Sequence, residues 1–211
     1  MCLCGRLSIS WRQKAIDAAM EDIESAFETR RLGPLDDYIG CSVVDQHYGS
    51  KKLIQADIVK KIEKEFVDAV SYLKNVKVPM ASGITVIRPT EDDPLLSPED
   101  QKDYRSAVGM LLYLVKHSRP DLSNGVRELS KVMRGATNDH VKLLHQVIKF
   151  VLETKDRGVL VKPNKHLGVT AYCDSDFAGD KGNRRPITGF LIDLHDVPIA
   201  WKSKQQGGVT F

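Results

Sequence analysis

The first third of the chain alternates between helical and strand-like spacing of its hydrophobic residues. Apolar residues four apart predict one helix over 11–27 and a second that carries Ile58, Ile62 and Phe66. Between these helices, residues 38–44 alternate between apolar and polar, and a turn at 47–50 leads to a return strand at 52–54. This pattern predicts a β-hairpin between two helices.

The middle of the chain opens with a change of composition. Residues 79–103 are rich in proline and in acidic residues, which predicts an acidic connecting loop and the best candidate for a domain boundary. Helical spacing then returns in three segments. They are a mostly apolar helix over 104–116, a helix after Arg119-Pro-Asp with Leu122, Val126, Leu129 and Met133 on one face, and a helix over 139–154.

From Gly168 onward the spacing becomes that of β-strands. Strands are expected over 169–174, 187–194 and 197–202, with a tight turn at 194–197 and a charged, glycine-rich loop at 177–186. A helical part followed by a strand part predicts an α+β fold class.

Composition narrows the class of protein. The chain has 211 residues, which suits one or two domains. No apolar run reaches the ~20 residues that a membrane-spanning helix needs, and no signal peptide is recognisable at the N-terminus. Of the four cysteines, Cys2 and Cys4 form a pair without a second pair downstream, so a zinc site is not expected. Free thiols fit a reducing compartment, the cytoplasm or the nucleus.

Positive charge is concentrated in the middle of the chain. Residues 104–165 hold 12 Lys and Arg against 5 Asp and Glu, a net charge of +7 in a chain whose total is +3. Two basic stripes are expected on the helices, one of Arg127, Lys131 and Arg134, the other of Lys142 and Lys149. They could follow a nucleic-acid backbone or simply face solvent, and charge alone favours neither interpretation.

Several motifs in a fixed order carry a family resemblance. Three lie in the helical part: Tyr-Arg-Ser-Ala-Val-Gly-Met-Leu-Leu-Tyr-Leu over 104–114, Arg-Pro-Asp-Leu-Ser over 119–123, and Ile-Lys-Phe-Val over 148–151 after His140. Three more lie in the strand part: Cys-Asp-Ser-Asp-Phe-Ala-Gly-Asp over 173–180, Arg-Arg-Pro-Ile-Thr-Gly-Phe over 184–190, and Trp-Lys-Ser-Lys-Gln-Gln over 201–206. Their sequence and order resemble the C-terminal region of copia-type retrotransposon polyproteins. Residues 27–35 and 38–43 match more loosely, so the resemblance covers nearly the whole chain.

The resemblance implies a domain organisation. Residues 1–78 would be the C-terminal remnant of the reverse-transcriptase palm, 79–103 the connecting loop and 104–166 a helical region like the thumb and connection. Residues 167–211 would be a truncated ribonuclease H-like domain with an incomplete three-stranded sheet. The bare edge and apolar face of such a sheet predict that residues 168–211 are poorly stable or pack onto the upstream helices.

The resemblance also implies which chemistry to expect. In the family, reverse transcription and ribonuclease H cleavage each use two Mg²⁺ ions held by carboxylates. The polymerase carboxylate pair would precede Met1, and Asp174 matches the first ribonuclease H carboxylate, as catalytic residue and metal ligand. Asp176 and Asp180 are expected to be loop or turn carboxylates, and the remaining ligands would follow Phe211.

One carboxylate cannot hold two divalent ions, so Asp174 is expected to be vestigial and Mg²⁺ not to bind productively. The chain is therefore expected to be a retroelement fragment without its own catalysis. Two alternatives stay open. One is a module that binds nucleic acid such as an RNA–DNA hybrid through the basic helices and through Lys202 and Lys204. The other is an open reading frame cut from a longer, active polyprotein.

Overall fold

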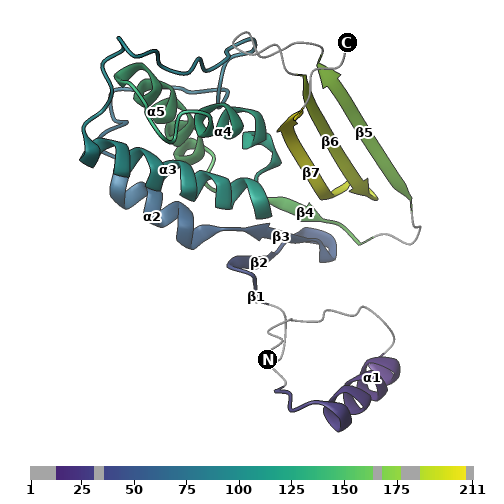
Figure 1. Ribbon diagram of the computed structural model, residues 1–211. Helices are drawn as coiled ribbons and strands as arrows, with labels where there is room; N and C mark the ends of the chain where they lie inside the picture. Colours follow the sequence, from purple (N-terminus) through teal and green to yellow (C-terminus); the bar gives the residue numbers. More distant parts are fainter. Residues whose placement is uncertain (1–12, 31–35, 164–167, 177–185, 208–211) are drawn as a thin grey trace.

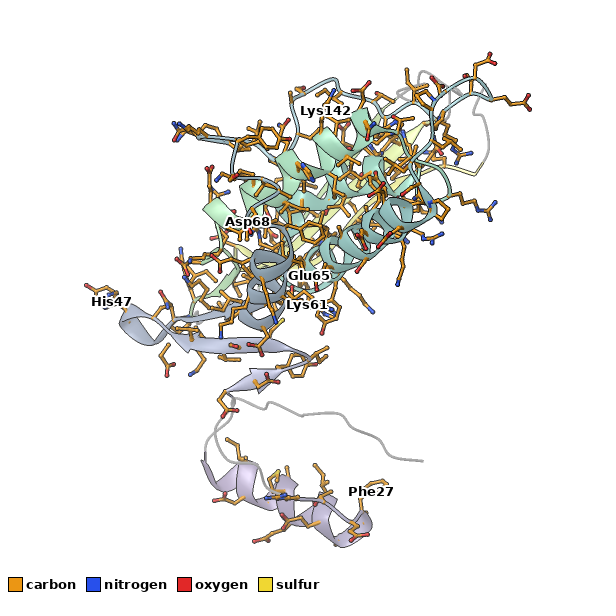
Figure 2. The ribbon with its side chains drawn as sticks, turned by 90° about the vertical axis from the view of Figure 1, so that its left-hand side faces the viewer. Phe27, His47, Lys61, Glu65, Asp68 and Lys142 are labelled. Carbon is orange, nitrogen blue, oxygen red and sulfur yellow. The ribbon has the colours of Figure 1, made fainter. Side chains whose placement is uncertain are left out.

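The computed structural model describes residues 13–30, 36–163, 168–176 and 186–207, and shows a mixed α and β protein with two antiparallel sheets. Figure 1 shows helices α2 (Ala56–Phe66), α3 (Pro98–His117), α4 (Ser123–Ser130) and α5 (Asn138–Glu153) lying together. Helix α1 (Gln13–Ala26) lies apart from them in both views (Figures 1 and 2). The expected α+β class is compatible with this arrangement.

The hydrophobic core lies between helices α2 to α5. It is made of the apolar faces that the helical spacing predicted, with Leu111, Leu122, Leu129 and Val147 among its fully buried members. Tyr104 is also buried, and its hydroxyl donates a hydrogen bond of 2.9 Å to the carbonyl of Leu129. Burial of the phenol raises the pKa of Tyr104 far above its ordinary value.

Helix α3 begins six residues earlier than its apolar spacing suggests, so part of the predicted loop over 79–103 is helical. The Ser97 hydroxyl accepts a hydrogen bond of 3.1 Å from the N–H of Asp100, and Pro98 occupies the first helical position. Glu99 and Asp100 lie in the first turn, where negative charge is favoured. The acidic, proline-containing composition here marks a helix start rather than a loop.

The rest of the connecting segment, residues 79–97, has no helix or strand but is fastened to the core. The N–H of Val86 donates to the Glu128 carboxylate at 2.8 Å, and the N–H of Leu96 donates to the carbonyl of Ala136 at 2.9 Å. The ring nitrogen Nε2 of His140 lies 3.1 Å from the carbonyl of Ile87. The segment is thus a strap across α4 and α5.

Helix α4 ends at Ser130, so the predicted helical face that included Met133 is too long. Residues 131–134 form turns. The buried Gln101 of α3 holds this region, because its Nε2 donates to the carbonyl of Met133 at 3.0 Å and its Oε1 accepts from the N–H of Ala136 at 2.7 Å. These bonds come from a residue more than 30 positions away, which local spacing does not reveal.

A four-stranded sheet lies along one side of the helices, in the order β1 (Asp37–Tyr38), β2 (Cys41–Asp45), β3 (Lys51–Ile54) and β4 (Val159–Val161). The β2–β3 hairpin confirms the prediction, but the expected strand over 38–44 is broken by a turn at Ile39 and Gly40, both with positive φ. Strand β4 was not predicted. It docks on β3 beside Gly158, where any Cβ would lie 1.9 Å from the carbonyl oxygen of Leu53.

The second sheet is a meander of β5 (Val169–Asp176), β6 (Ile187–Leu194) and β7 (Val197–Gln205), which confirms the three predicted strands and extends two of them. His195 and Asp196 have positive φ, as a two-residue hairpin turn requires. Strand β7 lies beside the helices (Figure 1), and the indole N–H of Trp201 donates to the carbonyl of Val115 at 2.6 Å. The sheet therefore packs onto the upstream helices through its β7 edge.

Candidate nucleic-acid interface

A groove of about 810 Å³ lies between the connecting segment, the turn after α4 and the end of β7. Among the residues that the structure describes, its charged lining residues are Arg88, Arg127, Lys131 and Arg134, and none is acidic. The described residues that line the groove come from three separate parts of the chain, residues 88–95, 127–135 and 205. Such a basic, open groove is suited to a polyanion.

Two of the four groove cations are already engaged with a buried carboxylate. The Glu128 side chain is 2% exposed, and its two oxygens accept hydrogen bonds from Arg127 Nη2 at 2.7 Å and from Lys131 Nζ at 2.8 Å. Val86 donates its N–H to the same carboxylate. Arg127 and Lys131 therefore stabilise the fold as well as lining the groove, and together with Glu128 they contribute one net positive charge.

The other two groove cations face solvent. Arg134 lies in the turn after α4, and Arg88 lies in the connecting segment; both side chains are exposed and neither forms an ion pair with the residues that the structure describes. Arg88 was not predicted, because its segment was interpreted as acidic. No local sequence signal identifies Arg88, whose position follows from the buried Val86 two residues earlier.

The second predicted stripe, on α5, is not part of the groove. Figure 2 shows Lys142 on this helix, where its Nζ lies 2.8 Å from Asp139. That hydrogen bond and the opposite charge raise the pKa of Lys142 and lower the pKa of Asp139. Lys149 lies 3.8 Å from Glu153 on the same helix. The structure thus places these two cations on another surface, each next to a carboxylate.

The two predicted lysines of β7 lie near the groove but do not line it. Lys202 pairs with Phe190 and Lys204 with Thr188, so both belong to the opposite sheet face from Trp201, which contacts the helices. Both lysines are exposed. Lys202 borders a smaller hollow between α3, α4 and β7, whereas the groove itself receives Gln205 from this strand.

The predicted metal position, Asp174, lies in the edge strand β5. Asp174 pairs with Gly189 and is exposed. Asp176 ends the same strand, but its side chain and the whole of Asp180 lie outside the described residues. Among the described residues, no group of three or more His, Cys, Asp or Glu side chains could hold a metal ion. Asp174 by itself would supply one of the several carboxylates that a two-metal site needs.

Comparison of the amino-acid sequence with known proteins identifies the family of this chain. The chain is 40% identical over 110 residues to the retrovirus-related Pol polyprotein from transposon RE2 of Arabidopsis thaliana, which covers 52% of the chain. It is also 30% identical over 188 residues, 89% of the chain, to an uncharacterized mitochondrial protein of the same plant, of which it covers 75%. The chain belongs to the copia-type retrotransposon polyproteins.

This copia-type chain is also 24% identical over 196 residues to a putative transposon Ty5-1 protein of Saccharomyces cerevisiae, covering 93% of the chain and 62% of that protein. It spans only 8% of the RE2 polyprotein and so corresponds to a small part of such a protein. No family profile and no solved structure matches it. The described part of this copia-type chain contains no helix that could span a membrane.

Proposed function

We propose that this retroelement polyprotein fragment binds the phosphate backbone of nucleic acid at the junction between reverse transcriptase and ribonuclease H. The observation that carries the proposal is the groove whose charged lining residues, in the part of the chain that the structure describes, are all cationic. Three of these cations come from the segment 127–134 that the family motifs enclose. An RNA–DNA hybrid, the intermediate of reverse transcription, is the proposed ligand.

The element order supports a finer assignment within this proposal. Residues 1–78 are assigned to the end of the reverse-transcriptase palm, 104–166 to the thumb and connection, and 167–211 to the first strands of ribonuclease H. The β5–β6–β7 meander has the carboxylate Asp174 in its first strand, where the family motif expects it. Its packing on α3 and α4 would bring the ribonuclease H strands and the helical region into contact with one duplex.

The proposed binding is electrostatic and should therefore depend on salt. Arg88 and Arg134 are exposed and are free to follow phosphates, whereas the groove's other two cations are partly neutralised by Glu128. If each exposed arginine displaces one counterion, removing both should lower the slope of log affinity against log salt by about 2. Their loss should weaken binding similarly for all sequences, because phosphate contacts carry no base information.

The test measures binding of a labelled RNA–DNA hybrid of about 20 base pairs by fluorescence anisotropy at several salt concentrations. The Arg88→Gln/Arg134→Gln variant should bind more weakly and with the shallower slope. The matched control is Arg105→Gln, an exposed arginine on α3 outside the groove lining. Equal slopes for the double variant and the control, or no binding at low salt, would refute the proposal.

We further propose that the chain alone does not cleave RNA, because Asp174 by itself cannot hold two divalent ions. The test is incubation of the hybrid with Mg²⁺ or Mn²⁺. RNA cleavage that Asp174→Asn abolishes would overturn this second proposal without affecting the first. The alternative of an active polyprotein predicts that adding the neighbouring coding sequence, with its further carboxylates, restores cleavage.

A further inference from the structure

A second, smaller hollow lies between α3, α4 and β7, with a volume of about 310 Å³. Helix α3 lines it with Leu112, Val115 and Lys116, which share one face because they are spaced three and four residues apart. Helix α4 contributes Ser123, Arg127 and Ser130, again one face of a helix. The hollow is thus built from regular elements and meets the groove at Arg127 and Ser130, which line both.

Two residues that line the hollow carry buried hydrogen-bonding groups without partners among the described residues. The Arg127 side chain is only 13% exposed, yet its Nε and Nη1 make no hydrogen bond. Its Nη2 alone is engaged, with Glu128 and with Asn124. The hydroxyl of Ser123, one helical turn away, is likewise buried and unpaired. Buried donors are almost always satisfied in folded proteins, so this cluster needs an explanation.

The chemistry of these groups identifies the class of ligand. Nε and Nη1 of arginine carry three N–H donors and no acceptor, and a serine hydroxyl can donate a fourth. Lys116 and Lys202 add two further positive charges to the lining, and none of the described lining residues is acidic. A small anionic group with several oxygens would accept hydrogen bonds from these donors and balance the positive charges. Carboxylates offer two oxygens, whereas a phosphate group offers three or four.

We propose that this hollow is a phosphate-binding site centred on Arg127, with Ser123 and Lys116 as its other ligands. The phosphate site itself does not depend on the proposed function, but the source of the phosphate group that occupies it does. A backbone phosphate of nucleic acid bound in the groove would reach the hollow past Arg127, because that residue lines both the groove and the hollow. Free phosphate or a mononucleotide would be the alternative source of the same group.

The test is binding of inorganic phosphate to the full chain, by calorimetry and as a rise in Tm, against chloride of equal ionic strength. Arg127→Lys keeps the charge beside Glu128 but removes the unpaired donors, so phosphate affinity should fall about tenfold. Ser123→Ala and Lys116→Gln should each weaken phosphate binding by roughly two- to tenfold. Their matched controls on exposed positions of α3, Ser106→Ala and Lys102→Gln, should leave it unchanged.

The results discriminate between a specific site and general attraction. A phosphate response equal to that of chloride, or equal losses in the variants and their controls, would overturn the proposal. A hybrid duplex that displaces phosphate identifies the backbone as the source, and one that does not identifies free phosphate or a nucleotide. Arg88→Gln/Arg134→Gln should weaken hybrid binding yet leave phosphate affinity intact, which separates failure of the groove from failure of this site.

Discussion

Replacement of Glu128 by glutamine should destabilise the protein strongly, although the two side chains have nearly the same shape. The Glu128 carboxylate is 2% exposed, while its partners Arg127 and Lys131 are 13% and 10% exposed. A glutamine could still accept the hydrogen bond from the Val86 N–H through its carbonyl oxygen. What it cannot supply is the negative charge, so two mostly buried cations would lose the counter-charge of the Glu128 carboxylate.

The expected size follows from measurements on buried ion pairs. Breaking such a pair from one side costs about 3–5 kcal/mol, because the remaining charge stays buried and unpaired. Some relief comes from the groove, where Lys131 and Arg127 can turn toward solvent. We therefore expect Glu128→Gln to lower the free energy of unfolding by about 3 kcal/mol, a large share of the 5–15 kcal/mol typical of a domain.

The chain offers a matched control in Glu153. Its carboxylate also accepts a backbone N–H, from Val76 at 2.8 Å, and lies 3.8 Å from a lysine, Lys149, but the side chain is 31% exposed. Because water screens this pair, Glu153→Gln should cost at most about 1 kcal/mol. Urea unfolding followed by circular dichroism measures both losses. Equal losses in the two variants would refute the argument that burial determines the cost.

Three further predictions concern the fold. Gly158→Ala places a Cβ 1.9 Å from the carbonyl oxygen of Leu53, so it should separate β4 from β3 and lower the free energy of unfolding by at least about 2 kcal/mol. The control Gly109→Ala, whose Cβ would meet no atom within 4 Å, should instead stabilise α3 by about 0.5–1 kcal/mol. Urea unfolding measures both changes. Tyr104→Phe removes the buried hydrogen bond to Leu129 and should cost about 1 kcal/mol, with a correspondingly lower Tm. Burial lowers the pKa of His145, and burial with the nearby Lys116 lowers that of His117. The unfolded chain therefore binds protons first as pH falls below about 6.5, and stability should decrease there. A His145→Gln variant should lose less stability than the wild type between pH 7 and pH 5, whereas an unchanged pH dependence would contradict this assignment.

Local sequence signals were sufficient for most elements of the fold. The helices with strong apolar spacing and the three strands of the second sheet lie where the pattern predicts them. The errors occur where contacts distant in sequence decide the structure. Strand β4 has only three residues and exists because β3 offers a free edge beside Gly158. Helix α4 ends early, and the segment that follows it is hydrogen-bonded through its backbone to Gln101 of α3.

The site was predictable only in part, because charge in a sequence does not reveal which cations are already paired. Arg127, Lys131 and Arg134 were expected on one stripe and do line one groove. The sequence did not show that Glu128, the residue adjacent to Arg127, would be buried between two of them. Lys142 and Lys149 have the same spacing on α5, yet lie on another surface next to carboxylates of their own helix. Helical spacing identifies a face but not what that face meets.

Glu128 links the stability of this region to its proposed binding. A buried carboxylate next to a site for polyanions would weaken binding if it served no other purpose, since it cancels a positive charge of the wall. Here it holds the Arg127 guanidinium by Nη2 alone, which leaves Nε and Nη1 without partners among the described residues. The same carboxylate fastens the strap that carries Arg88 through the N–H of Val86. Glu128 cancels one positive charge of the groove, but it also preorganises the site. Arg127 and Arg88 are both held near the groove before any ligand binds. If that is correct, Glu128→Gln should raise the salt dependence of hybrid binding without a matching gain in affinity at low salt.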